Sequence, residues 1–101
     1  MNTRVIEIVT FKLAKGISEA EFLATLPAVN AFITACDGFI ARRLSKDDDG
    51  LWTDHLEWTD MAAAKAASDQ FPQQQGLGPF MTAMDMQSVK MSHNHLQLSL
   101  G

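Results

Sequence analysis

The chain has 101 residues, of which 47% are hydrophobic and 20% are charged, and its formal net charge is −4. A chain of this length and composition forms one globular domain, here residues 1–101. The acidic balance argues against nucleic acid or a membrane surface as a partner, because both favour a basic face. A single cysteine, Cys36, excludes an intrachain disulfide and is typical of a reducing compartment, so we expect a cytoplasmic protein.

The N-terminal part of the chain predicts a strand followed by a helix. Residues 4–13 are rich in Val, Ile, Thr and Phe, which favour a strand. Ser18 and Glu21 have the spacing of a capping box, at the start of a helix that extends to about residue 35. Because Pro27 lies inside this span, we expect either a kink at the proline or a helix that begins later than Ser18.

A β-hairpin is predicted next. Residues 39–46 (FIARRLSK) and 51–58 (LWTDHLEW) favour strands, and the acidic turn over residues 47–50 (DDDG) joins them. In the second of these strands, side chains 52, 54, 56 and 58 share one face, and side chains 53, 55 and 57 share the other. We expect the first set, which holds both tryptophans, to pack against the helices.

The C-terminal part predicts a second helix and a last strand. Thr59 or Asp60 caps an alanine-rich helix that ends at Phe71, because Pro72 follows it. The remaining elements are a polar loop with glycines, one helical turn and a strand, over residues 73–79, 80–84 and 88–98.

The predicted order of elements is therefore β-α-β-β-α-β. With right-handed crossovers it gives a ferredoxin-like α+β fold, a four-stranded antiparallel sheet with two helices on one face. The first strand is apolar on both faces, with Ile6 and Ile8 on one side and Val5 and Val9 on the other. Because helices cover only one face of such a sheet, we expect a second copy of the chain to cover the other face and form a homodimer.

Several segments together resemble a known superfamily. They are VIEIVTFKL, the SxxEF helix start, GFIARRL, HLEW and the alanine-rich helix that ends in Phe71. In these segments the chain resembles the dimeric α/β-barrel superfamily, and within it the antibiotic-biosynthesis-monooxygenase-like domains. The resemblance implies a dimeric α/β barrel. Among the superfamily's activities are cofactor-free oxygenation of aromatic polyketides or quinols, haem degradation and aldehyde isomerisation, so the resemblance indicates fold more than activity.

Glu7, His55 and Glu57 are the candidate catalytic residues. In a ferredoxin-like sheet the first strand lies beside the strand of His55 and Glu57, so Glu7 is expected near them if the register places all three on one face. A desolvated carboxylate has a raised pKa and serves as a general base. His55 and Glu57 point the same way, as a pair that abstracts a proton.

Each candidate also has a structural interpretation. A buried charge needs a partner, so Glu7 is alternatively an interface carboxylate paired with Arg42 or Arg43. His55 and Glu57 are alternatively part of a wet, polar sheet face. The sequence leaves both pairs of interpretations open.

Three residues are candidates for substrate binding. Trp58 and Phe80 would line an apolar pocket, and Asn30 would hold a substrate oxygen; the alternative for Trp58 is a place in the helix-facing core. Four methionines near the C-terminus shape an adaptable apolar pocket or simply fill the core, at positions 81, 84, 86 and 91.

His93 and His95 have the spacing of a metal-chelating pair on one face of the last strand. A stable site needs further ligands, and the first strand is expected to separate this pair from His55 and Glu57. We therefore expect no metal and no cofactor. Haem ligation by His93 or His95 is the remaining alternative.

The sequence is compatible with two functions of different classes. The first is a cofactor-independent monooxygenase of the antibiotic-biosynthesis-monooxygenase-like kind, which acts on a small aromatic or quinol-type substrate in an apolar cavity. The second is a non-catalytic dimeric module for small-ligand binding or stress response. In both, the partner is a small apolar or aromatic molecule.

Overall fold

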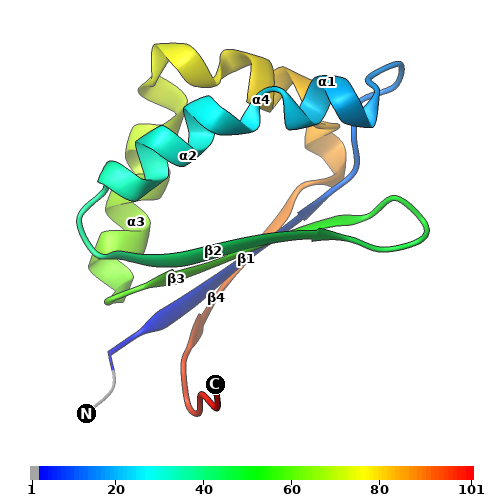
Figure 1. Ribbon diagram of the computed structural model, residues 1–101. Helices are drawn as coiled ribbons and strands as arrows, with labels where there is room; N and C mark the ends of the chain where they lie inside the picture. Colours follow the sequence, from blue (N-terminus) through cyan, green and yellow to red (C-terminus); the bar gives the residue numbers. More distant parts are fainter. Residues whose placement is uncertain (1–2) are drawn as a thin grey trace.

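In the computed structural model, which describes residues 3–101, helices cover one face of a four-stranded antiparallel sheet (Figure 1). The strands are β1 (Val5–Phe11), β2 (Phe39–Lys46), β3 (Trp52–Trp58) and β4 (Lys90–His95). The helices are α1 (Glu19–Leu23), α2 (Leu26–Ala35), α3 (Met61–Gln70) and α4 (Gly78–Ala83). Three 3-10 turns are η1 (Phe71–Gln73), η2 (Gln75–Leu77) and η3 (Met86–Ser88). The predicted ferredoxin-like α+β fold is confirmed.

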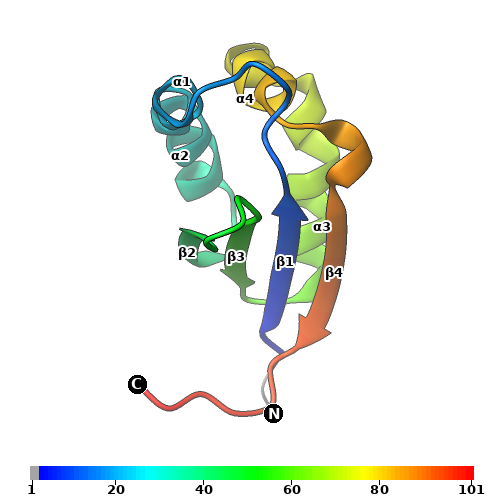
Figure 2. The ribbon, with the colours of Figure 1, turned by 90° about the vertical axis from the view of Figure 1, so that its right-hand side faces the viewer.

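The strand order is β2-β3-β1-β4, so β1 lies in the middle of the sheet between β3 and β4 (Figure 2). All three pairings are antiparallel. In this register Glu7 of β1 lies opposite Leu56 of β3 and opposite His93 of β4. Ile8, the next residue, lies opposite His55 and Ser92. The register decides which side chains share a face.

The face toward the helices is the buried one. Because side chains alternate along a strand, Val5, Glu7, Val9 and Phe11 of β1 point toward the helices. The helix-facing residues of β3 are Trp52, Asp54, Leu56 and Trp58, and all four are buried, the two tryptophans as predicted. An irregularity between Phe39 and Ala41 sets the register of β2 so that Arg42 lies opposite Leu56, on this same face. The opposite face of β1 and β3 carries residues 6, 8, 53, 55 and 57, which are half-buried.

Pro27 divides the first predicted helix in two. The predicted capping box is present at the start of α1, where the amide of Glu21 donates to the hydroxyl of Ser18 and the Glu21 carboxylate accepts from the Ser18 amide, both at 3.1 Å. α1 ends at Leu23, and α2 begins with Pro27 in its first turn. An amide in the first turn has no partner within its helix, so proline costs nothing there. The outcome is a new helix rather than a kink.

The junctions around α3 follow the expected cap chemistry. The Asp60 carboxylate accepts from the amide of Ala63 at 2.8 Å, which confirms it as the N-cap. Gly38, which precedes β2, has a φ of 83°, and a Cβ on it would lie 2.5 Å from the Cβ of Ala63 and 2.6 Å from the hydroxyl of Thr59. Only glycine tolerates both this conformation and this close approach.

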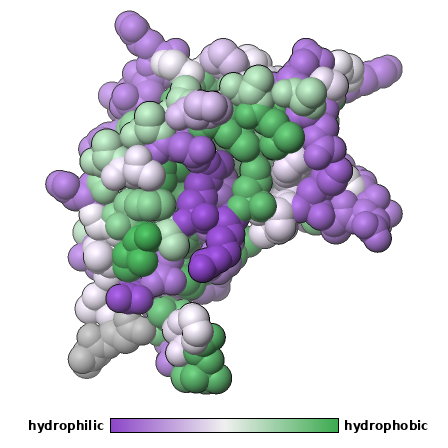
Figure 3. Space-filling model, in the orientation of Figure 1, coloured by the Kyte–Doolittle hydropathy of each residue, from purple (hydrophilic) through white to green (hydrophobic). Residues whose placement is uncertain are grey.

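The C-terminal region differs from its prediction in two ways. The expected loop over residues 73–79 contains the 3-10 turn η2 and the start of α4. The last strand is shorter than the predicted 88–98, because Ser88 belongs to η3 and pairing ends at His95. Beyond it, Leu98 and Leu100 are 73% and 87% exposed. Figure 3 shows this end of the chain as a hydrophobic projection below the body.

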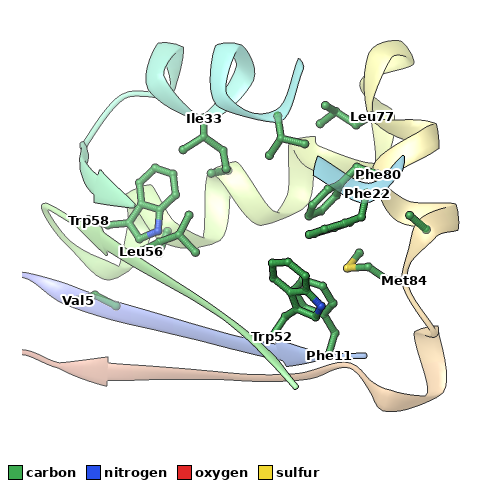
Figure 4. Close-up of a cluster of buried hydrophobic side chains, with 14 residues drawn as sticks. Val5, Phe11, Phe22, Ile33, Trp52, Leu56, Trp58, Leu77, Phe80 and Met84 are labelled. Atoms are coloured by element: carbon green, nitrogen blue, oxygen red, sulfur yellow. The ribbon is translucent and has the colours of Figure 1, made fainter. Parts of the chain in front are cut away.

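An aromatic cluster fills one end of the space between sheet and helices. Phe11 and Trp52 come from the sheet, and Phe22 and Phe80 from the helices above it (Figure 4). The contacting rings of this cluster have centroids 4.8 to 6.4 Å apart, in the range of favourable aromatic pairs. Trp58 lies at the other end of β3, where its ring meets Phe39 edge to face.

None of the helices found within residues 3–101 combines the length and the apolar character that a membrane span requires.

Candidate functional site

A mostly apolar cavity of about 230 Å³ lies between the sheet and the helices. Its aromatic lining includes Trp58 and Phe80, the two aromatic residues predicted to line a substrate pocket. Four methionines also line it, Met81, Met84, Met86 and Met91. Met86 and Met91 are 60% and 49% exposed, so the cavity reaches the surface between η3 and β4. Met84 also belongs to the buried core, so the methionines both line the pocket and pack against the core beside it.

Glu7 brings a carboxylate into this cavity from the middle of the sheet. The residue is 7% exposed, and its Oε1 lies 3.0 Å from Nε2 of His93. Burial raises the pKa of Glu7, and the negative charge of Asp54 raises it further. The hydrogen bond and the charge of His93 lower the same pKa but leave it above its ordinary value. The site thus holds a carboxylate that binds a proton more tightly than one in water.

The expected pairing of Glu7 with Arg42 or Arg43 is wrong. Arg42 instead binds Asp54 with two hydrogen bonds of 2.9 and 2.7 Å, and both side chains are 8% exposed. Asn30 accepts a third hydrogen bond from Arg42 at 2.8 Å. Asn30 therefore holds the arginine, and it is not among the residues that line the cavity.

Asp54 is a cavity residue that sequence reasoning missed as part of the site. The signal was present, since an acidic residue interrupts the otherwise apolar face Trp-x-Asp-x-Leu-x-Trp of β3. A charge on a buried face requires a partner, and Arg42 of β2, which lies opposite the neighbouring Leu56, supplies it.

The side chains of His55 and Glu57 do not share a face with Glu7, because they lie on the opposite face of the sheet. His55 lies opposite Ile8, and Glu57 lies opposite Ile6, whereas Glu7 alternates with both isoleucines. On that open face Glu57 forms an ion pair with Arg4, with 3.0 Å between the guanidinium nitrogen and the carboxylate oxygen. Glu7, His55 and Glu57 were expected to form one catalytic group if the register placed them on one face. The observed register places Glu7 on the helix-covered face and the other two on the open face, so this expectation is corrected.

The indole nitrogen of Trp58 is a buried donor without a hydrogen-bond acceptor among residues 3–101. Trp58 lines the cavity, and its nitrogen is turned toward Leu56 in Figure 4. A buried donor left unpaired costs about 1–3 kcal/mol. An acceptor oxygen on a bound molecule would satisfy it.

His93 and His95 share the helix-facing side of β4, opposite Glu7 and Val5. Within the described part of the chain, no group of three potential metal ligands forms around them or elsewhere. The bond from His93 to Glu7 gives this histidine a role that the metal-pair interpretation did not include.

Neither a protein-family model nor a curated protein matches the sequence. Solved structures do match, several of them are described as antibiotic biosynthesis monooxygenases, and the chain shares their fold.

Three of these structures illustrate the likeness. SnoaB, a cofactor-independent oxygenase from Streptomyces nogalater, is 22% identical with a TM-score of 0.66, over 98% of this chain and 96% of that chain. A monooxygenase from the gene ActVA-Orf6 of Streptomyces coelicolor, in complex with the ligand Nanaomycin D, is 15% identical with a TM-score of 0.69, over 98% and 92%. PA3566 from Pseudomonas aeruginosa is 23% identical with a TM-score of 0.70, over 97% and 98%.

Proposed function

We propose that this chain is a cofactor-independent monooxygenase that oxidises a small aromatic or quinol-type substrate in the cavity. One observation carries the proposal: an apolar cavity is lined by a desolvated carboxylate, Glu7, and by Trp58, whose buried indole N–H has no acceptor among residues 3–101. A base and a hydrogen-bond donor are the two groups needed to ionise a phenol or an activated methylene. The description of SnoaB as a cofactor-independent oxygenase supports the same class of reaction.

In the proposed reaction, Glu7 removes a proton from the substrate, and the substrate anion transfers electrons to dioxygen. For an activated methylene, R₂CH₂ and O₂ give R₂C=O and H₂O. The substrate carbon supplies all four electrons, so no other reductant is consumed. The indole N–H of Trp58 donates to the substrate oxygen that becomes negative when the proton leaves. An apolar surrounding strengthens this hydrogen bond.

The size of the cavity favours small substrates. Ligand pockets commonly measure roughly 300–1,000 Å³, and this one, at about 230 Å³, lies below that range. One or two fused rings suit such a volume better than a larger polycyclic skeleton. Hydroquinones, naphthols and naphthohydroquinones are therefore the first substrates to test.

We also propose that the chain forms a homodimer through the open face of the sheet. Ile6 and Ile8 are half-buried on that face, and the helices all lie on the other one. Light scattering after size-exclusion chromatography measures the mass. The variant Ile8→Lys is expected to be monomeric with an unchanged circular-dichroism spectrum, and a monomeric wild-type protein would contradict the proposal.

Oxygen uptake and incorporation of ¹⁸O from ¹⁸O₂ test the monooxygenase. Purified protein without added metal, flavin or nicotinamide cofactor is expected to oxidise at least one compound of the panel. Glu7→Gln should lower kcat at least about 100-fold, the usual contribution of a general base. Glu57→Gln makes the same chemical change on the other face and should retain turnover.

Two outcomes would overturn this function. Loss of turnover in Glu57→Gln but not in Glu7→Gln would show that the catalytic site lies on the open face and not in the cavity. Tight binding of panel compounds without oxygen uptake would instead support the alternative, a non-catalytic small-ligand-binding module.

A further inference from the structure

We propose that Glu7 and His93 form a proton relay that connects the cavity to solvent through the edge of the sheet. This inference rests on the proposed function, in which Glu7 is the base. His93 acts through Glu7 and is therefore a positioning residue rather than a catalytic one.

The pair of Glu7 and His93 extends from the interior of the protein to its surface. Glu7 lies on the central strand β1 and lines the cavity, with a side chain that is 10% exposed. His93 lies on the edge strand β4, with a side chain that is 21% exposed. The 3.0 Å separation between Glu7 Oε1 and His93 Nε2 is a hydrogen-bond distance. One end of the pair faces the substrate, and the other reaches the outer edge of the sheet.

His93 is the hydrogen-bond partner of the Glu7 side chain within residues 3–101. Of the other titratable groups on this face, Asp54 of β3 is paired with Arg42 of β2, and His95 of β4 lies opposite Val5. The helical residues that line the cavity carry no titratable side chain in the described structure. A proton that leaves Glu7 along a hydrogen bond therefore leaves toward His93.

A substrate in the cavity would leave His93 as the route by which Glu7 exchanges protons with solvent. Met86 and Met91 line the cavity and are exposed, so a bound aromatic molecule would lie between Glu7 and the water that reaches these two residues. Once Glu7 has taken a proton from one substrate molecule, the carboxyl must release that proton before it can serve as a base again. The proton passes from Glu7 Oε1 to His93 Nε2, and the proton on Nδ1 then passes to a surface water. The products of this transfer are a Glu7 carboxylate, a neutral imidazole and a hydronium ion.

The chain offers a matched control for this relay. His93→Gln keeps a donor to Glu7 but has no ring to pass a proton, whereas His95→Gln makes the same change two residues along the same face. His93→Gln is expected to lower kcat at least about tenfold with little change in KM. It also removes the positive charge that lowers the pKa of Glu7, so the rise of activity with pH should move to higher pH. Added imidazole should restore part of the rate, and His95→Gln should behave as wild type.

A second measurement does not depend on turnover. In substrate-free protein, the ¹³C resonance of the Glu7 carboxyl and the ring resonances of His93 are followed against pH. A relay requires the two groups to titrate together, so each substitution, Glu7→Gln or His93→Gln, should change the titration curve of the other group. Thermal unfolding checks that both variants remain folded.

The outcomes separate the relay from the proposed function. Independent titration of Glu7 and His93, or a His93→Gln enzyme with the pH profile of wild type and no response to imidazole, would overturn the relay. If no panel compound is oxidised but the two groups titrate together, the monooxygenase fails while proton sharing between Glu7 and His93 stands.

Discussion

The two faces of the sheet carry similar kinds of side chains in different surroundings. On the face covered by helices, Glu7 and Asp54 are buried, and each has a cationic or imidazole partner within 3.0 Å. On the open face, His55 and Glu57 are half-buried, and the Arg4 partner of Glu57 is 52% exposed. Alternation along a strand places charged side chains on both faces of the sheet. Helix packing then determines which of these side chains are desolvated. Chemistry that depends on desolvation belongs to the covered face.

The largest expected effect tests burial on the covered face. Trp58→Ala removes a side chain that is 1% exposed and enlarges an existing cavity. We expect a loss of about 3–5 kcal/mol in the free energy of unfolding, measured with urea. Thr53→Ala on the open face of the same strand should cost less than about 1 kcal/mol. Similar losses for the two variants would remove the energetic distinction between the faces.

The next effect tests the buried ion pair. Arg42→Met leaves the Asp54 carboxylate buried without its partner, and breaking such a pair costs about 3 kcal/mol or more. The double variant Arg42→Met, Asp54→Leu replaces both charges and should recover most of that loss. A double-mutant cycle from urea unfolding measures the coupling. If the double variant is no more stable than Arg42→Met, then lost packing rather than an uncompensated charge explains the effect.

A third, pH-dependent effect distinguishes Glu7 from the carboxylates of the open face. The folded-state pKa of Glu7 is raised, so the folded protein holds this proton more tightly than the unfolded chain. The resulting contribution to the free energy of unfolding is complete at pH values below the ordinary glutamate pKa, and it is lost as pH rises through the raised pKa of the folded state. Glu7→Gln should therefore gain stability relative to wild type across that window. Urea unfolding at several pH values measures this difference, and a difference independent of pH would contradict it.

The smallest effect concerns the open face itself. Glu57→Gln breaks a 3.0 Å pair with the exposed Arg4, and pairs of this kind contribute about 0–1 kcal/mol. The loss should shrink further in high salt, because solvent ions screen exposed charges. A salt-independent loss above about 2 kcal/mol would show that Glu57 is desolvated like Glu7.

Local patterns in the sequence were sufficient for most of the fold. The capping box at Ser18, the cap at Asp60 and the acidic turn over 47–50 are each determined by residues within a few positions, so they were predictable. The alternation of β3 likewise identified its buried face. The short last strand was not predictable, because residues 96–98 continue to alternate after the partner strand β1 has ended.

The site was only partly predictable because it depends on cross-strand register. Glu7, Trp58 and Phe80 were named from their residue types, and all three line the cavity. The neighbours of Glu7 depend on pairing between residues far apart in the chain, such as Glu7 with His93. Nothing local distinguishes that register from one that would place Glu7 beside His55.

β4 is synthesised after every other strand, yet it pairs with β1, which is synthesised first. Until residues 90–95 are available, one edge of the apolar segment Val5–Phe11 lacks a partner and is a template for pairing with another chain. A charge in the middle of such a segment works against aggregation, because an intermolecular sheet would have to bury it without a partner. Glu7 occupies that position, so the carboxylate of the cavity is also expected to disfavour such pairing before β4 is in place.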